Sequence, residues 1–285
     1  MKAMVPWPVK IAGKIVLARL PVNYRAWKRL GIFEHGAMER PDYSDSVFRG
    51  HFSRSGLAGR RGFTCLELGP GDTLFSALIA RAHGAAASWL VDVGDFAERD
   101  TAPYRAMALH LAAQGLAVPA ASAFTSLDDL LADCHAQYLT DGLAALRRLP
   151  SASIDFQFSQ AVLEHIRRRD FADLVTELRR ILRPGGVSSH RIDLRDHLGG
   201  ALNNLRFPEG LWEADWFARS GFYTNRLRMS EMLGTFRAAG FAADVVAIDR
   251  WPALPTPRRH LAAAFRELGD DELLVSGFDV VLRPE

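Results

Sequence analysis

Cysteine is almost absent from this 285-residue chain, long apolar runs are missing, and no lysine follows position 28. The two cysteines, Cys65 and Cys134, lie far apart in sequence, which excludes a disulfide framework and a cysteine-rich metal site. No run approaches the roughly 18 to 20 apolar residues of a membrane span, and Lys10 and Lys14 interrupt the apolar segment 9–20. We therefore expect neither a membrane span nor a secretory signal, and a cytoplasmic location.

Basic residues are concentrated near the N-terminus. Residues 1–60 hold eleven Lys and Arg against four Asp and Glu, a formal charge of +7, although the whole chain carries only +2. Apolar side chains such as Trp7, Ile11 and Trp27 are interleaved with these charges. We expect 1–60 to form a basic helical cap that packs on the core and covers the active site. Two alternatives stay open: peripheral contact with an anionic membrane at its inner face, and attraction of an anionic substrate.

A glycine turn is the most informative motif of the chain. Residues 67–72 read ELGPGD, between the apolar run 63–66 and the helix-like segment 74–83. Gly69 and Gly71 allow the backbone to approach a ligand closely, because neither has a Cβ atom. This arrangement of strand, glycine turn and helix is where an α/β sheet binds a nucleotide-like ligand.

The turn also lacks a feature that dinucleotide binding requires. A third glycine would be needed three residues after Gly71, to let helix and strand pack beside a diphosphate, but that residue is Leu74. The carboxylate of Glu67 would repel phosphate and suits a ligand with an ammonium and a sulfonium group. A nicotinamide-dependent oxidoreductase is therefore the disfavoured alternative.

Three further segments follow the turn. Asp92 ends the apolar run 88–91 about twenty residues later, where a carboxylate can accept hydrogen bonds from both ribose hydroxyls. The segment 153–166 has a strand pattern that continues into a polar turn and a helix start. The segment 178–187 reads as a helix stopped by Pro-Gly-Gly and followed by a strand.

In this order and spacing, the four pieces resemble the class I methyltransferases that use S-adenosylmethionine, over about residues 62–194. The resemblance implies an α/β fold, a Rossmann-like three-layer sandwich whose mostly parallel seven-stranded sheet has one antiparallel strand. It implies S-adenosyl-L-methionine as methyl donor and S-adenosyl-L-homocysteine as product. It also implies which residues bind the cofactor: Glu67, Gly69, Pro70 and Gly71 on the methionine and ribose side, Asp92 at the ribose hydroxyls, Asp141 and Gly142 beside the adenine, and Ser159 with Gln160 over its middle.

The methyltransferase domain is expected to span 61–285, with a substrate-recognition insertion at about 195–227. The insertion mixes aromatic and polar residues without helical or strand period, which is typical of recognition loops. Its expected substrate-binding residues are Asn204, Trp212, Tyr223, Asn225 and Arg226. After it, the pattern predicts a helix over 229–239, a strand over 243–250, a helix over 258–268 and a strand over 276–283.

Methyl transfer to a hydroxyl requires an aligned acceptor and a base that removes its proton. His165 is the first candidate for this base, because it follows the fourth strand and its imidazole titrates near neutral pH. Glu164 would orient it, and Asp193 and His197 form a second catalytic set after the fifth strand. The structural alternative is that Glu164 and His165 only start a helix.

Neither a metal nor a nucleic acid is expected. Glu164, His165, Asp193 and His197 include ligands that suit divalent ions. However, relatives that bind a metal have a Glu three residues before the Glu-His pair, where this chain has Ala161. Residues 159–162 read SQAV instead of the Asp or Asn-Pro-Pro-aromatic turn that clamps a flipped base.

The expected function is methyl transfer from S-adenosylmethionine to a hydroxyl of a small molecule or of a sugar or glycan. The C-terminal half resembles poorly characterised bacterial methyltransferases associated with surface-glycan synthesis, so an acceptor linked to an anionic carrier is one option. The alternatives are a nicotinamide-dependent oxidoreductase and a catalytically silent protein that binds an adenosyl ligand. The oligomeric state stays open.

Overall fold

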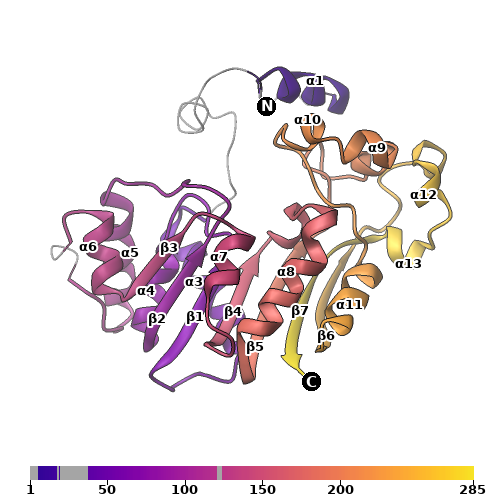
Figure 1. Cartoon of the computed structure of the whole chain (residues 1–285). Helices are drawn as coiled ribbons and strands as arrows, with labels where there is room; N and C mark the ends of the chain where they lie inside the picture. Colours follow the sequence, from indigo (N-terminus) through magenta and orange to yellow (C-terminus); the bar gives the residue numbers. More distant parts are fainter. Residues whose placement is uncertain (1–5, 18, 20–37, 121–123) are drawn as a thin grey trace.

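A seven-stranded sheet forms the centre of the computed structural model, which describes residues 6–17, 19, 38–120 and 124–285 (Figure 1). The strand order is β3-β2-β1-β4-β5-β7-β6. The strands are β1 (Phe63–Leu68), β2 (Ala85–Val91), β3 (Ala136–Leu139), β4 (Ile154–Gln160), β5 (Leu182–Asp193), β6 (Phe241–Arg250) and β7 (Val275–Pro284). Neighbours from β3 to β5 pair in parallel, whereas β7 is antiparallel to both β5 and β6. The predicted mostly parallel sheet with one antiparallel strand is confirmed.

Helices cover both faces of the sheet and give the three layers. One apolar cluster joins one face to α3 (Pro41–Ser53), α4 (Phe75–Ala82), α5 (Ala102–Ala113) and α6 (Leu127–Asp133). A second joins the other face to α7 (Leu143–Arg148), α8 (Arg168–Ile181) and α11 (Met229–Ala238). Because both faces are covered, β1 is apolar on both: Phe63 and Cys65 belong to the first cluster, Leu66 and Leu68 to the second.

The described part of the segment 1–60 contains the helices α1 and α3, which have different surroundings. α3 is part of the core, where Phe48 and Phe52 stack on one another and pack against Phe156 of β4. α1 (Trp7–Leu17) packs instead against the insertion 195–227 (Figure 1). The prediction for 1–5, 18 and 20–37, Trp27 included, lies outside the described residues. Among the described helices, none is both long and apolar enough to cross a membrane.

The insertion and the C-terminal connection contain only short helices. They are η2 (Asn203–Arg206), α9 (Glu209–Trp212), α10 (Asp215–Ala218), η3 (Arg258–His260), α12 (Ala263–Arg266) and α13 (Asp270–Leu273). The prediction of one helix over 258–268 is therefore wrong. The backbone is extended at Leu261 and Ala262, and the N–H of Ala262 donates to the carbonyl oxygen of Leu205, 2.9 Å away. This tertiary bond and the burial of Leu261 override the local helical preference.

The amphipathic helix α8 supplies a stability test. Its buried residues are Phe171, Leu174, Val175, Leu178 and Ile181, which repeat at helical spacing and face the sheet. Leu178→Ala should lower the free energy of unfolding by about 2–5 kcal/mol, because it leaves a cavity in a closed core. Leu109→Ala is the matched control, since Leu109 is 63% exposed, and should change it by less than about 0.5 kcal/mol. Urea unfolding measures both, and equal losses would contradict the assigned layers.

Candidate active site

The glycine turn after β1 lies at the edge of the sheet where the parallel strands end. Gly69 and Gly71 have φ angles of +72° and +67°, which glycine adopts without strain. A Cβ atom on Gly69 would lie 2.5 Å from a methyl group of Val162, in the turn after β4. A Cβ atom on Gly71 would meet nothing within 4 Å. Gly69 therefore packs two turns together, while Gly71 leaves space for a ligand.

Asp92 connects the end of β2 to this turn. Its Oδ2 accepts a hydrogen bond from the N–H of Gly71, at 3.0 Å, and its Oδ1 accepts one from Val93, at 2.7 Å. The N–H of Gly142 donates to the carbonyl oxygen of Asp92, at 2.8 Å. Asp141 is exposed and forms an ion pair with Arg148, at 2.7 Å. The structure thus brings Gly71, Asp92 and Gly142 together, and the exposed Asp141 lies beside Gly142.

Glu67 is buried at the end of β1, on the face that packs against α4. Burial raises the pKa of its carboxyl group to about 8, with a further rise from Asp92 and an opposing effect of a hydrogen bond from Ser76. Its Oε2 atom has no hydrogen-bond partner among the described residues. A buried carboxyl beside Asp92, with one oxygen that has no partner among the described residues, fits a ligand that brings a positive charge.

Ser159 and Gln160 follow one another on β4 and have different partners. The Ser159 hydroxyl is fully buried and bonds to Nδ1 of His190, at 2.7 Å. Gln160 is partly exposed, and its Oε1 accepts a hydrogen bond from Nε2 of His51, at 3.0 Å. Burial lowers the pKa of His51 to about 4, so this histidine is neutral. Of the two side chains, only Gln160 is partly exposed at the end of the strand. The sequence did not predict its hydrogen bond with His51 of α3.

The four predicted catalytic residues converge at the ends of β4 and β5. His165, in η1 (Leu163–His165), stacks on His197 with ring centroids 4.7 Å apart. Nδ1 of His165 lies 3.0 Å from the carbonyl oxygen of Tyr223. Because a carbonyl only accepts, Nδ1 carries the hydrogen, and neutral His165 has its lone pair on Nε2.

The carboxyl groups beside these histidines differ in charge. Burial raises the pKa of Glu164 to about 8, and the charge of Asp193 raises it further. Burial also raises the pKa of Asp193, but the guanidinium of Arg195 binds both of its oxygens and lowers the pKa overall. Burial lowers the pKa of His197. At neutral pH, Glu164 is therefore protonated, and Asp193 is a carboxylate paired with Arg195.

The residues predicted to bind substrate are buried and support the histidine turn. Asn225 donates from its backbone N–H to the oxygen of Glu164, at 2.7 Å, and from Nδ2 to the oxygens of Leu163 and Ile166, at 2.8 and 3.1 Å. The Tyr223 hydroxyl accepts a hydrogen bond from the N–H of Arg168. These bonds fix the turn that carries His165.

Asn204, Trp212 and Arg226 have similar supporting positions. Asn204 Nδ2 donates to the hydroxyl of Thr224, and the Trp212 indole donates to the Thr224 carbonyl oxygen. Arg226 donates to the oxygen of Phe207, and its guanidinium lies 5.3 Å from the Trp212 ring centroid. Trp212 has no exposed surface in this arrangement. Direct contact of these side chains with an acceptor stays a prediction.

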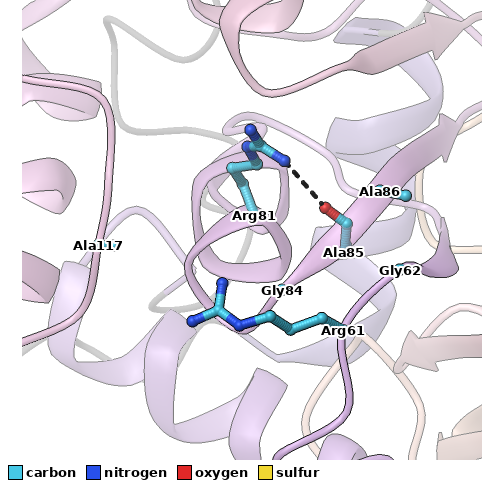
Figure 2. Close-up of a pocket in the computed structure, with 7 residues that line it drawn as sticks. All are labelled: Arg61, Gly62, Arg81, Gly84, Ala85, Ala86 and Ala117. Atoms are coloured by element: carbon cyan, nitrogen blue, oxygen red, sulfur yellow. Dashed lines mark hydrogen bonds between the residues drawn. The ribbon is translucent and has the colours of Figure 1, made fainter.

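A separate surface hollow lies at the opposite edge of the sheet. It has a volume of about 310 Å³ and is lined by Arg61, Gly62, Arg81, Gly84, Ala85, Ala86 and Ala117 (Figure 2). Gly62 precedes β1, and Ala85 begins β2. Because these are the starts of parallel strands, the hollow is remote from the glycine turn and the histidines. Within the described part of the chain, no group of three or more His, Cys, Asp and Glu is arranged to hold a metal ion.

Comparison with known proteins identifies the class of the domain. Residues 66–189 match the family model of a methyltransferase domain. The match runs from β1 into β5 and includes the glycine turn, Asp92 and the histidine turn. With the sheet order, the match indicates the Rossmann-like fold of a methyltransferase domain. A search of curated proteins found no significant match.

Several solved structures resemble the chain weakly. A S-adenosylmethionine-dependent methyltransferase from Mesorhizobium loti is 20% identical, over 87% of this chain and 98% of its own, with a TM-score of 0.46. One from Methanosarcina mazei is 14% identical, over 84% and 96%, with a TM-score of 0.47. Phosphoethanolamine N-methyltransferase 2 of Haemonchus contortus, in complex with S-adenosyl-L-methionine, is 14% identical, over 84% of this chain and 53% of its own, with a TM-score of 0.46.

The two glycines of the turn should respond differently to alanine. Both substitutions place a Cβ atom at positive φ, at a cost of about 1–2 kcal/mol. Gly69→Ala also forces that atom onto Val162, so it should lose about 1–3 kcal/mol more, and Val162→Ala in the same chain should restore part of the loss. Gly71→Ala should lose only the cost of its positive φ, but it should bind S-adenosylhomocysteine more weakly. Urea unfolding and calorimetry measure these effects, and a larger loss of stability for Gly71→Ala would contradict the packing described.

Proposed function

We propose that this chain transfers the methyl group of S-adenosylmethionine to a hydroxyl of a small molecule or sugar. The observation that carries the proposal is the hydrogen bond from Nδ1 of His165 to the carbonyl oxygen of Tyr223. It fixes the tautomer in which Nε2 is the basic nitrogen, and this ring stacks on His197 at the end of β5. A hydroxyl acceptor requires such a base, because its proton must leave as the oxygen attacks.

The residues at the strand ends fit the cofactor. Glu67 would pair with its ammonium group, the backbone at Gly71 would lie against it, and Asp92 would accept hydrogen bonds from the ribose hydroxyls. Asp141 and Gly142 would lie on the adenine side, and Gln160 would cover the middle. The cofactor supplies an electrophilic methyl group on a sulfonium.

The protein then has two tasks, to align the acceptor and to remove its proton. A bound cofactor would supply a methyl carbon with sulfur as its leaving group, and the acceptor oxygen would take up that carbon. The hydroxyl proton passes to Nε2 of His165. Glu164 is protonated near neutral pH and therefore supports the turn without charging it. His197 packs on the imidazole and limits its orientation.

The two other functions are less well supported. A nicotinamide-dependent oxidoreductase would need a glycine where Leu74 is fully buried at the start of α4. A catalytically silent binding protein would bind the cofactor and show no turnover. A sugar of a surface glycan, free or on an anionic carrier, is the acceptor class that we propose, because it offers hydroxyls and suits the basic N-terminal segment.

Cofactor binding should release a proton from Glu67. With a pKa of about 8, this carboxyl group is protonated at pH 7, and an ammonium group beside it lowers that pKa. Calorimetry of S-adenosylhomocysteine binding at pH 7, in buffers of different ionisation enthalpy, should show release of about one proton. Glu67→Gln should abolish the release. Glu164→Gln, at an equally buried carboxyl of the same pKa, should leave it unchanged, and loss in both variants would contradict the assignment.

Loss of the proposed base should affect turnover and not cofactor binding. His165→Gln should lower kcat by about 10²- to 10⁴-fold and remove the acidic limb of the pH profile. The assay is transfer of labelled methyl groups to panels of sugars, nucleotide sugars, phenols and lipids. His260→Gln is the control, because His260 is an exposed histidine of η3. An unchanged pH profile for His165→Gln would show that His165 is not the base.

A further inference from the structure

Helix α3 brings one histidine, His51, to the edge of the sheet where the parallel strands end. His51 is 3% exposed, and its ring packs on that of Phe158 of β4, with centroids 5.3 Å apart. The next side chain on this face of β4 is that of Gln160, because alternate residues of a strand share a face. Since α3 precedes β1 in the chain, the segment 1–60 contributes a side chain to this edge.

The strand register places Gln160 beside the glycine turn. Phe158 of β4 is paired with Glu67 of β1, and two residues further along the two segments are Gln160 and Gly69. Glu67 shares the face of Cys65, which belongs to the same apolar cluster as Phe158. The Gln160 amide and the Glu67 carboxyl therefore lie on one face of two neighbouring strands.

A short chain of hydrogen bonds fixes the amide. Nε2 of His51 donates to Oε1 of Gln160, at 3.0 Å. Burial lowers the pKa of His51 to about 4, so near neutral pH the imidazole carries only this one hydrogen. Nδ1 accordingly accepts a hydrogen bond from the buried hydroxyl of Ser189 on β5, at 2.8 Å. The tautomer of His51 and the orientation of the amide are thus set together.

The position of the imidazole is set by the packing of α3 on the sheet. Phe48, one turn before His51, lies edge-on to the Phe158 ring, with centroids 5.5 Å apart. Arg54, which follows the helix, forms an ion pair with Asp279 of β7, at 2.6 Å. Because α3 is held on both sides of His51, the histidine orients the amide and the amide does not have to hold the histidine.

We propose that His51 is a positioning residue of the cofactor site, which holds the Gln160 amide with its NH2 group turned towards the ligand. The inference rests on the proposed function, because it concerns the cofactor of that reaction. An amide is planar, so when its oxygen is bound by an imidazole its two N–H donors lie on the other side. Gln160 then donates to an oxygen of the ligand, in a carboxylate or on the ribose.

Positioning of this kind strengthens binding by lowering the entropy that binding costs. A free glutamine side chain loses rotamer freedom when a ligand fixes it, whereas one already held in place loses little. The arrangement also complements the role proposed for Glu67. A carboxyl group and an amide N–H on neighbouring strands provide an acceptor and a donor for the two ends of an amino-acid group.

The test is calorimetry of S-adenosylhomocysteine binding to the full chain. His51→Leu should weaken the affinity by about fivefold or more, because the amide loses its fixed partner. His51→Gln should bind within about twofold of the wild type, since its amide N–H can take the place of Nε2. His83→Leu is the matched control, because His83 packs on the same α3 rings, Phe48 and Phe52, and should also stay within about twofold.

Two further measurements separate positioning from a structural role. Gln160→Leu should weaken binding about as much as His51→Leu, and the double variant should be no weaker, because the histidine acts through the amide. Losses that multiply in the double variant would show that His51 acts independently of Gln160 and would overturn the inference. Nitrogen-15 NMR of the wild type should place the imidazole hydrogen of His51 on Nε2, and a hydrogen on Nδ1 alone would also overturn it.

The probe 5′-methylthioadenosine, which lacks the amino-acid group, distinguishes the two kinds of ligand oxygen. A loss in His51→Leu with S-adenosylhomocysteine alone assigns the amide to the carboxylate, and an equal loss with both ligands assigns it to the ribose. An unchanged affinity for both would reject the role of His51. Failure of the wild type to bind S-adenosylhomocysteine would reject the proposed function instead. If His51→Leu does not fold, His51→Gln is compared with the shorter His51→Asn, and equal affinities of these two would reject the inference.

Discussion

The turn that carries His165 depends on one buried residue, Asn225, and above all on its side-chain amide. It bonds to carbonyl oxygens on both sides of the histidine turn, while its backbone N–H bonds to the carbonyl between them. Without these donors, each buried carbonyl would be left unpaired, at about 1–3 kcal/mol. The histidine turn follows the end of β4 and lies outside the strand pairing. The segment 195–227 therefore supplies the hydrogen-bond donors for its carbonyl groups. The placement of His165 is therefore a property of the insertion as much as of the strand.

Burial gives two glutamates at this edge the same pKa and different chemistry. Glu67 and Glu164 lie near the ends of β1 and β4, and each has a pKa of about 8. Glu67 comes two residues before Gly69 of the glycine turn, and its Oε2 has no hydrogen-bond partner among the described residues, so a cation there could restore its charge. Glu164 is next to Asp193, whose negative charge opposes its ionisation. One carboxyl is thus suited to binding a charged group, and the other to remaining neutral within a hydrogen-bonded turn.

The sheet, the glycine turn and Asp92 could be predicted from sequence because local patterns determine them. Buried parallel strands are apolar on both faces, and the turn needs glycine at positive φ. The directions of neighbouring side chains could not be predicted in the same way. Ser159 and Gln160 point to opposite faces of β4, and their partners, His190 and His51, lie 31 and 109 residues away in sequence.

The arrangement of the insertion 195–227 could not be predicted from the sequence. Its aromatic residues have no period, so nothing in the sequence distinguishes an exposed recognition surface from a small separate core. In the structure, Trp212 is the centre of such a core, which also contains Phe217 and Phe222.

The core has a consequence for biosynthesis. α1 leaves the ribosome well before its partners, which lie about two hundred residues later in the chain. The sheet strands β1 to β5 can pair before those partners are made, so the contacts of α1 with the insertion form only after these strands have been synthesised.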